Sequence, residues 1–163
     1  MKIIQERKHN MKTVIIYGSR HHGNTKKVCD RIATECGAEL VEAVSVDESF
    51  RWEDYELIGF ASGIAYGRFY DDVVRAAQKV PKSKKVFFLY TCARNDKDFS
   101  SGIQKTVSDR GSDCIGSYGC RGYNTYGPLK LIGGMNKNNP SEDELKGAVD
   151  FVKDLEAKHE KQY

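Results

Sequence analysis

The stretch Ser19-Arg20-His21-His22-Gly23-Asn24-Thr25 decides the fold, because an apolar run precedes it and a helical pattern follows it. Residues 13–17 read Thr-Val-Ile-Ile-Tyr, and apolar residues recur at helical spacing from Val28 to Cys36. A strand that passes through such a turn into a helix gathers unpaired backbone N–H groups and the positive end of the helix dipole at one point. Ser19 and Thr25 add hydroxyl donors. The stretch therefore predicts a site for a phosphorylated cofactor.

Size and composition limit the possible classes of protein. The chain has 163 residues, 39% hydrophobic and 30% charged, which favours one globular domain with one core. A net charge of +3 is too small to indicate a nucleic-acid partner. No apolar run approaches the ~20 residues that cross a bilayer, and segment 1–10 lacks the apolar core of a secretory signal. We expect a cytoplasmic protein without a membrane span, with an N-terminal extension at 1–10 and a domain at 11–163.

The five cysteines do not predict a disulfide framework or a zinc site, because their number is odd and they form no C-x-x-C pair. His21 and His22 are adjacent, and adjacent side chains rarely converge on one ion, so we expect no metal site. Cys92 and Cys120 each end a predicted strand. A redox role for these two thiols stays open at this point.

Strand and helix patterns alternate along the rest of the chain. Further strands are predicted at 39–44, 55–61, 85–90 and 114–118. Helices are predicted at 71–80, at 101–110 and from Ser141 onward, where Ser141 and Glu144 form a capping box. This alternation predicts a doubly wound α/β fold, whose ligands bind beyond the carboxyl ends of the strands. The segments at that end of the predicted sheet are 19–25, 62–68, 92–100 and 120–140.

Particular residues exclude three other designs for a phosphate or nucleotide site. A nucleoside triphosphatase loop needs Lys after its second glycine, where this chain has Asn24. The dinucleotide pattern G-x-G-x-x-G is absent, because Gly18 and Gly23 have the wrong spacing. A response-regulator receiver needs clustered carboxylates after the first strand, where Gly18-Ser19-Arg20 stands instead.

The remaining pattern resembles the flavodoxin family. The family motif is a strand ending in Tyr-x-Ser and then Gly-Asn-Thr at the start of a helix; here it stands as Tyr17-Gly18-Ser19 and Gly23-Asn24-Thr25. The resemblance covers nearly the whole chain from Met11. It implies a flavodoxin-like three-layer sandwich with a five-stranded parallel sheet in the order 2-1-3-4-5, and FMN as the cofactor.

The resemblance also implies which residues bind the cofactor, and these lie in three loops. The first loop comprises Ser19, Arg20, His21, His22, Gly23, Asn24 and Thr25. Within it, the phosphate would be held by Ser19, His21, Gly23, Asn24 and Thr25. The second and third loops would flank the flavin ring and comprise Ser62, Gly63, Ile64, Ala65, Tyr66 and Gly67, and then Thr91, Cys92, Ala93, Arg94 and Asn95. Tyr66 is the expected stacking partner of the ring. Gly63 would permit a peptide reorientation toward flavin N5, as in other members.

Two departures from the family pattern bear on function. Four arginines lie in the flavin-side loops, namely Arg20, Arg68, Arg94 and Arg121. Their positive charge is offset only in part by Asp71, Asp72, Asp96 and Asp98. The arginines therefore predict a less negative redox potential than that of a low-potential carrier. The second departure is a long, tyrosine-rich connection at 120–140, here called the insertion, which includes Tyr123 and Tyr126. Long loops at the binding end of a sheet are typically functional.

These features leave three functions open. The first is an electron carrier that uses non-covalently bound FMN to serve a redox partner protein or a small-molecule electron acceptor. The second is an FMN-dependent oxidoreductase acting on a small molecule, either a quinone reductase or an enzyme similar to the flavodoxin-like protoporphyrinogen oxidases, which the stretch 61–70 and the insertion resemble. The third is an interaction domain without flavin. No catalytic residue is assigned.

Overall fold

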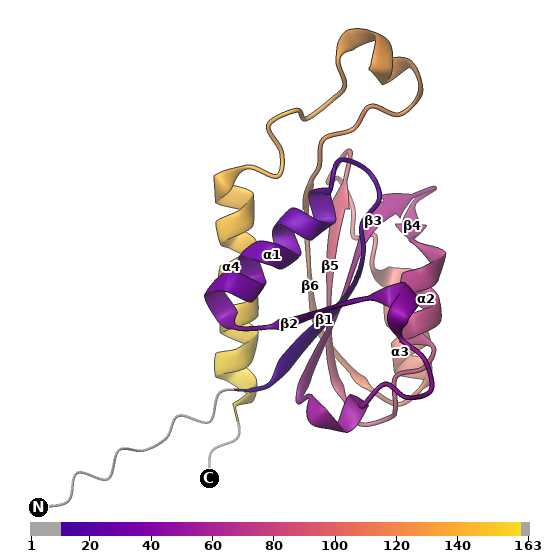
Figure 1. The fold of residues 1–163 in the computed structure, drawn as a ribbon, viewed down its shortest axis with the longest axis vertical. Coiled ribbons are helices and arrows are strands. Elements are labelled where there is room, and N and C mark those ends of the chain that lie inside the picture. The colour runs from indigo at the N-terminus through magenta and orange to yellow at the C-terminus, as the bar shows by residue number, and fades with distance from the viewer. Residues whose placement is uncertain (1–10, 161–163) are drawn as a thin grey trace, which may run out of the picture.

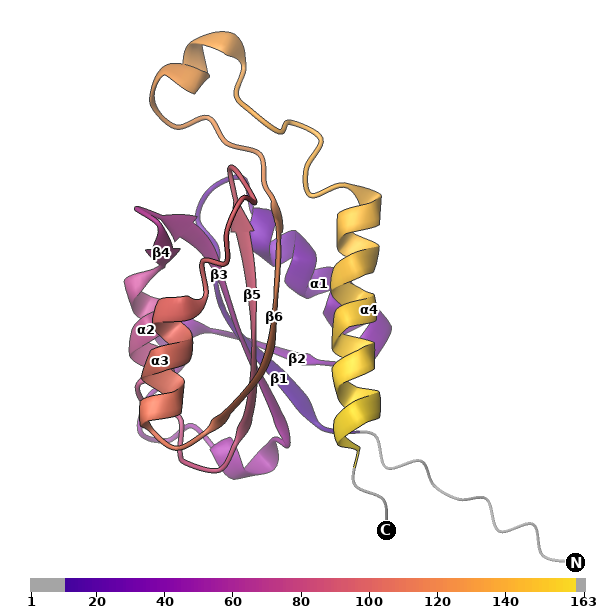
Figure 2. The same ribbon diagram turned by 180° about the vertical axis from the view of Figure 1, so that it is seen from behind.

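The computed structural model describes residues 11–160, and these form three layers (Figures 1 and 2). The strands are β1 (Thr13–Gly18), β2 (Glu39–Glu42), β3 (Leu57–Ala65), β4 (Arg68–Phe69), β5 (Lys85–Cys92) and β6 (Asp113–Arg121). The helices are α1 (Asn24–Cys36), α2 (Asp71–Ala77), α3 (Ser101–Asp109) and α4 (Glu142–His159). Short 3-10 turns are η1 (Ala43–Ser45), η2 (Trp52–Asp54) and η3 (Gly127–Ile132). The extension expected at 1–10 lies outside the described residues.

The sheet has the predicted topology. Its five parallel strands run in the order β2-β1-β3-β5-β6. Because β4 is an extra short strand that pairs antiparallel with β3, this order is the predicted 2-1-3-4-5. Helices α1 and α4 cover one face of the sheet and α2 and α3 cover the other (Figure 1). The flavodoxin-like fold is therefore confirmed.

The continuous apolar runs of the central strands reflect burial on both faces. In β1, Val14 and Ile16 contact the core beneath α2 and α3, whereas Ile15 contacts the core beneath α1 and α4. In β5, Phe88 and Phe87 divide in the same way. Side chains alternate along a strand, so a strand covered on both faces needs apolar residues at consecutive positions.

The second predicted loop differs from expectation, because its first four residues, 62–65, belong to β3. β3 continues four residues past its predicted end and pairs with β4 through Ile64 opposite Phe69 and Ala65 opposite Arg68. Tyr66 and Gly67 form the turn between the strands, with φ of 54° and 76°. Positive φ at both central residues matches the right-handed twist of a tight hairpin. Segment 62–69 is thus a projecting hairpin rather than an open loop.

Smaller differences concern element ends. α2 ends at Ala77 instead of continuing to residue 80, β2 ends at Glu42, and β6 extends on both sides of its predicted range to span Asp113–Arg121. The insertion rises above the carboxyl end of the sheet and carries η3 at its tip (Figures 1 and 2). Within residues 11–160, no helix combines the length and apolar character that a membrane crossing needs.

Gly59, the third residue of β3, allows a test of how tightly the core is packed. A Cβ at this position would lie 2.5 Å from the ring of Phe87, which is fully buried. We expect Gly59→Ala to lower the free energy of unfolding by ~1–3 kcal/mol, because a filled core accepts an extra methyl group poorly. Urea denaturation measures this effect. Gly102→Ala is the matched control, since nothing lies within 4 Å of its added Cβ; an equal loss in both variants would contradict the prediction.

Candidate functional site

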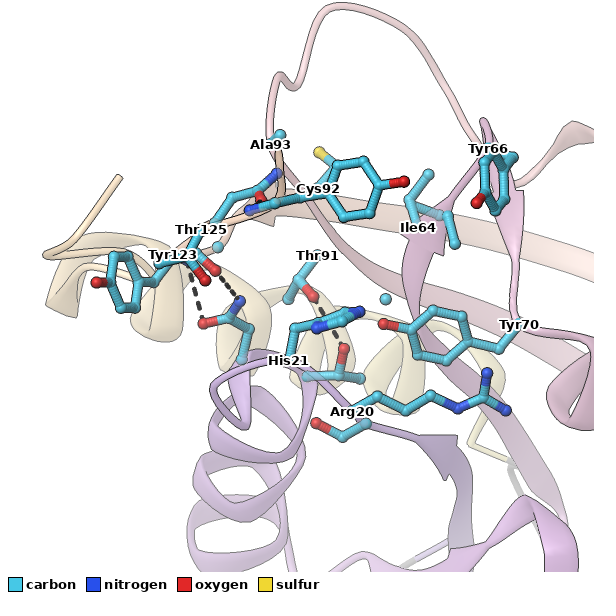
Figure 3. A pocket seen from close by; sticks show the side chains of 18 of the residues that line it. Arg20, His21, Ile64, Tyr66, Tyr70, Thr91, Cys92, Ala93, Tyr123 and Thr125 are labelled. Atoms are coloured by element: carbon cyan, nitrogen blue, oxygen red, sulfur yellow. Dashed lines mark hydrogen bonds between the residues drawn. The ribbon is translucent and has the colours of Figure 1, made fainter. Parts of the chain in front are cut away.

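A cavity of about 620 Å³ opens at the carboxyl end of the sheet, within the ~300–1,000 Å³ of small-molecule and cofactor sites (Figure 3). Its walls come from the loop after β1, the β3–β4 hairpin, the end of β5 and the insertion. The predicted residues that line it are Ser19, Arg20, His21, Asn24, Thr25, Gly63, Ile64, Ala65, Tyr66, Thr91, Cys92 and Ala93. The predicted residues that do not line it are His22, Gly23, Ser62, Gly67, Arg94 and Asn95.

The start of α1 has the geometry of an anion site. Gly23, the N-cap residue, is left-handed with φ of 63° and has no side chain with which to cap the helix. The backbone N–H of Lys26 donates to Ser19 Oγ at 3.2 Å, which leaves the Ser19 hydroxyl proton available for another acceptor. A helix terminus with a hydroxyl donor beside it attracts a phosphate through the N–H groups of its first turn and the helix dipole.

A buried pair of hydroxyls joins the first and third loops. Thr25 Oγ1 and Thr91 Oγ1 are 2.9 Å apart, and both residues are buried. Two hydroxyls have two protons and use one of them between themselves, so one proton remains for an acceptor in the cavity. Figure 3 marks this hydrogen bond by the dashed line that starts at Thr91. The pair can therefore both brace the two loops and bind a ligand.

Two other residues of the first loop hold the insertion. Asn24 is buried, and its side-chain amide donates to the carbonyl of Tyr123 at 2.8 Å while its carbonyl accepts from the Tyr123 N–H at 3.2 Å. His22 Nε2 lies 2.9 Å from Thr125 Oγ1, and its ring centroid is 4.1 Å from that of Tyr123. Both ends of the Asn24 amide thus bond to backbone that is distant in the sequence.

In the second loop, Ser62 has a structural role. It is fully buried, and its hydroxyl donates to the carbonyl of Gly63 at 2.6 Å and accepts from the N–H of Tyr70 at 2.8 Å. These bonds close the base of the hairpin. Gly63 is required sterically, because a Cβ there would collide with the Tyr70 hydroxyl. Tyr70 also lines the cavity, although it was not among the predicted cofactor residues.

Tyr66 and Tyr126 line the cavity from two different segments. The side chain of Tyr66, at the hairpin turn, is 92% exposed, and that of Tyr126, in the insertion, is 69% exposed. The neighbouring Tyr66 side chain raises the pKa of Tyr126. The predicted stacking residue therefore projects from the hairpin toward the insertion, with which it forms the two sides of the opening.

The third loop contributes its backbone and a buried thiol. Asn95 turns away and donates to the carbonyl of Gly119 at 2.9 Å, while Arg94 lies 3.8 Å from Asp96. Cys92 lines the cavity, and burial raises the pKa of its thiol to about 11; burial likewise raises the pKa of Cys120 to about 12. A protonated thiol is a poor nucleophile, so the structure disfavours thiolate chemistry at neutral pH.

Ion pairs offset the positive charge of the four arginines in the flavin-side loops. Each arginine lies within 4.0 Å of a carboxylate, in the pairs Arg20–Asp72, Arg68–Asp71, Arg94–Asp96 and Arg121–Glu144. Their combined field at the cavity is therefore weaker than their number suggests, and the expected rise in potential does not follow from them. Lys130 of η3 lines the cavity and has no ion pair within the described part of the chain.

The insertion is fastened at its base and along its length. The Glu144 carboxylate accepts from the N–H of Arg121 at 2.7 Å and from the side chains of Asn139 and Ser141. The side chain of Asn136 donates to the carbonyl of Ala93 at 2.7 Å. Residues of the insertion that line the cavity are Gly122, Tyr123, Asn124, Thr125, Tyr126, Gly127 and Lys130. The unusual length and tyrosine content of 120–140 were the signals for this wall, but its individual contacts were not predictable.

Across residues 11–160, the structure brings no three His, Cys, Asp or Glu side chains together as a metal site. All five cysteines are free thiols. The chemistry available at the cavity is therefore that of hydroxyl and amide donors, aromatic rings and one unpaired cation.

Comparison with known proteins places this architecture in a family. The Flavodoxin domain matches residues 14–122, which is more than half of the chain. The chain belongs to the flavodoxin family. The family match ends at Gly122, where the chain leaves β6 and the insertion begins to wall the cavity.

Individual proteins resemble this flavodoxin-family chain over nearly its whole length. An uncharacterized protein of Methanocaldococcus jannaschii is 37% identical over 150 residues, covering 89% of this chain and 98% of that protein. Oxidised flavodoxin 1 from Bacillus cereus has a TM-score of 0.66 at 18% identity, covering 91% and 98% of the two chains. A Fusobacterium nucleatum flavodoxin variant bound to flavin mononucleotide has a TM-score of 0.62 at 14% identity, covering 91% and 97%. At these identities the two structures show a shared fold.

Glu144 makes the attachment of the insertion dependent on pH. Burial alone would raise its pKa, but hydrogen bonds from Arg121, Asn139 and Ser141 hold the pKa below its usual value. The folded pKa is thus lower than the ~4.3 of an unfolded glutamate. The stabilisation is complete above that pH and is lost as the pH falls through the folded pKa.

We expect Glu144→Gln to lower the free energy of unfolding by ~1–3 kcal/mol at pH 7, because an amide cannot accept all of these hydrogen bonds. The difference from the unmodified chain should shrink below about pH 4. Urea denaturation at several pH values measures it. Glu142→Gln, which alters an exposed pair with Arg31, is the control. A loss independent of pH would contradict the assigned role.

Proposed function

We propose that the chain is a redox protein that binds FMN non-covalently in the cavity at the carboxyl end of the sheet and transfers electrons through it. The observation that carries this proposal is the start of α1 at Gly23, which opens with Ser19 and the Thr25–Thr91 pair into a cavity walled by the hairpin and the third loop. Membership of the flavodoxin family supports a flavin there.

The residues present fit FMN at both chemical ends of the cofactor. Its phosphate would take the hydroxyl protons of Ser19 and the Thr25–Thr91 pair and the N–H groups at the start of α1. Its flat ring would lie against the apolar part of the wall, where Ile64 and Tyr66 line the cavity. When bound, FMN would supply the one- and two-electron redox chemistry that these side chains lack.

The electrons would pass to a redox partner protein or to a small-molecule acceptor at the open mouth. Large apolar side chains are exposed beside it, with Leu131 at 90% and Ile132 at 76% exposure in η3. Exposed apolar side chains that gather at one place are typical of a contact surface.

A second candidate is an FMN-dependent oxidoreductase that binds a small molecule over the flavin. The insertion favours it, because Tyr126 and the unpaired Lys130 extend the cavity beyond the three flavodoxin loops. An aromatic ring and a cation at the mouth would suit a planar substrate with an anionic group, such as a quinone that carries a carboxylate.

The optical spectrum and redox behaviour of the protein mixed with FMN test both candidates. We expect a yellow complex whose redox titration resolves two one-electron steps, with negligible turnover of quinones, because the favoured function is electron transfer. Rapid quinone turnover with a single two-electron step would instead establish the second candidate. A colourless protein that does not bind FMN would contradict both.

The double variant Ser19→Ala/Thr25→Ala tests the phosphate position. Removing both hydroxyls should weaken FMN binding by ~1–3 kcal/mol for each charge-assisted hydrogen bond lost, measured by quenching of flavin fluorescence. Thr106→Ala, which removes a hydroxyl from the exposed surface of α3, is the control. Unchanged FMN affinity in the double variant would mean that the phosphate binds elsewhere.

A further inference from the structure

The insertion is joined to two of the three predicted cofactor loops. It meets the first loop through Asn24 and Tyr123 and the third loop through the N–H of Gly122, which donates to the carbonyl of Cys92 at 2.9 Å. The Asn136 side chain adds a bond to Ala93. The family match ends at Gly122, so most of these contacts lie where the chain goes beyond the matched domain.

Asn24 holds the insertion through both ends of its side-chain amide. The side-chain amide pairs with both the N–H and the carbonyl of one residue, Tyr123, as a neighbouring strand would. The site is also sterically closed, because a Cβ on Gly122 would lie 2.5 Å from Asn24 Nδ2. Asn24 is buried at the first position of α1, so its position is set by the helix rather than by the insertion.

This geometry gives Asn24 a different task from the phosphate contact that the family resemblance implied. Its two hydrogen bonds direct the amide toward the backbone of Tyr123 (dashed lines near Tyr123 in Figure 3). The amide oxygen is an acceptor and accepts from Tyr123, so it has no attraction for a phosphate.

We propose that the insertion is a wall of the flavin site and that Asn24 is the positioning residue that holds this wall in place. The inference rests on the proposed function, because it concerns the same cavity. Asn24 acts through Tyr123, whose neighbours Asn124, Thr125 and Tyr126 line the cavity. The bonds to Asn24 fix the start of this segment, and the Glu144 and Asn136 bonds fix its other parts.

Losing a wall of the site and losing a phosphate ligand would change the binding affinities of FMN and riboflavin in different ways. FMN carries a phosphate and riboflavin does not, while both have the same ring. Loss of a wall that contacts the ring and its side chain weakens both flavins by the same factor. Loss of a phosphate ligand weakens FMN alone. The ratio of the two affinities therefore separates the two roles of Asn24.

The experiment titrates FMN and riboflavin with the full chain and its variants, following flavin fluorescence. We expect Asn24→Ala to weaken both flavins about tenfold, as the loss of two hydrogen bonds predicts, and to leave their affinity ratio unchanged. Gly122→Ala should act in the same way, because it disrupts the same contact from the insertion side. Ser19→Ala/Thr25→Ala should lower the affinity for FMN far more than for riboflavin.

The control is Asn138→Ala, which removes an exposed amide from the insertion itself and should change neither affinity. Weakened FMN binding with unchanged riboflavin binding in Asn24→Ala would overturn the inference and make Asn24 a phosphate ligand. Unchanged binding of both flavins would also overturn it. If Asn24→Ala does not fold, as judged by circular dichroism, Gly122→Ala decides the question.

Limited trypsin digestion separates this inference from the proposed function, because it needs no flavin. Lys130 and Lys137 lie exposed in the insertion. Asn24→Ala should raise the rate of cleavage at these lysines at least severalfold over Asn138→Ala, because the segment loses its attachment to α1. Equal rates would overturn the positioning role. A chain that binds neither flavin but shows the faster cleavage would refute the proposed function and retain the positioning role of Asn24.

Discussion

Burial of the central strands on both faces is the constraint on which the rest of the structure depends. β1, β3 and β5 lie between two helical layers, and their side chains contact one core or the other at successive positions. Almost no polar group along these strands is open to a ligand, so recognition is confined to the loops beyond their ends. Because the strands are parallel, their carboxyl ends bring three such loops to one edge. The buried Thr25–Thr91 contact then joins two of those loops into a single site.

The insertion changes what the shared flavodoxin fold offers at that edge. It supplies a fourth wall to the cavity and holds it through side chains that are anchored in α1 and at the start of α4. The charged side chains at this edge are also paired locally. Each of the four arginines is placed beside a carboxylate, so Lys130 is the cation at the cavity for which the described residues supply no ion pair. The insertion therefore alters both the shape and the charge of the opening.

Much of the fold could be predicted because its signals are local. Apolar runs at 13–17 and 85–90 indicated buried parallel strands, and the turn at 19–25 indicated where a phosphate would bind. The hairpin at 62–69 was not predicted, because its glycines resemble an ordinary turn and its pairing partner, Phe69, follows the turn. Ser62 was assigned to the cofactor for the same reason, although its hydroxyl closes the base of that hairpin. Tyr70 was not among the predicted cofactor residues, since its place at the cavity depends on the hairpin.

The sequence by itself determined the layered parallel sheet and the edge at which a ligand would bind, and its resemblance to the flavodoxin family implied the order of the strands. The first two properties depend on hydrophobic periodicity and on the chemistry of short turns, which are readable over a few residues. Only the tertiary structure decided the partners of the polar side chains at that edge. Asn24 and Tyr123 are separated by 99 residues, and Thr25 and Thr91 by 66. Such pairs depend on the relative placement of whole elements, and a side-chain amide can bind backbone or ligand equally well until that placement is set.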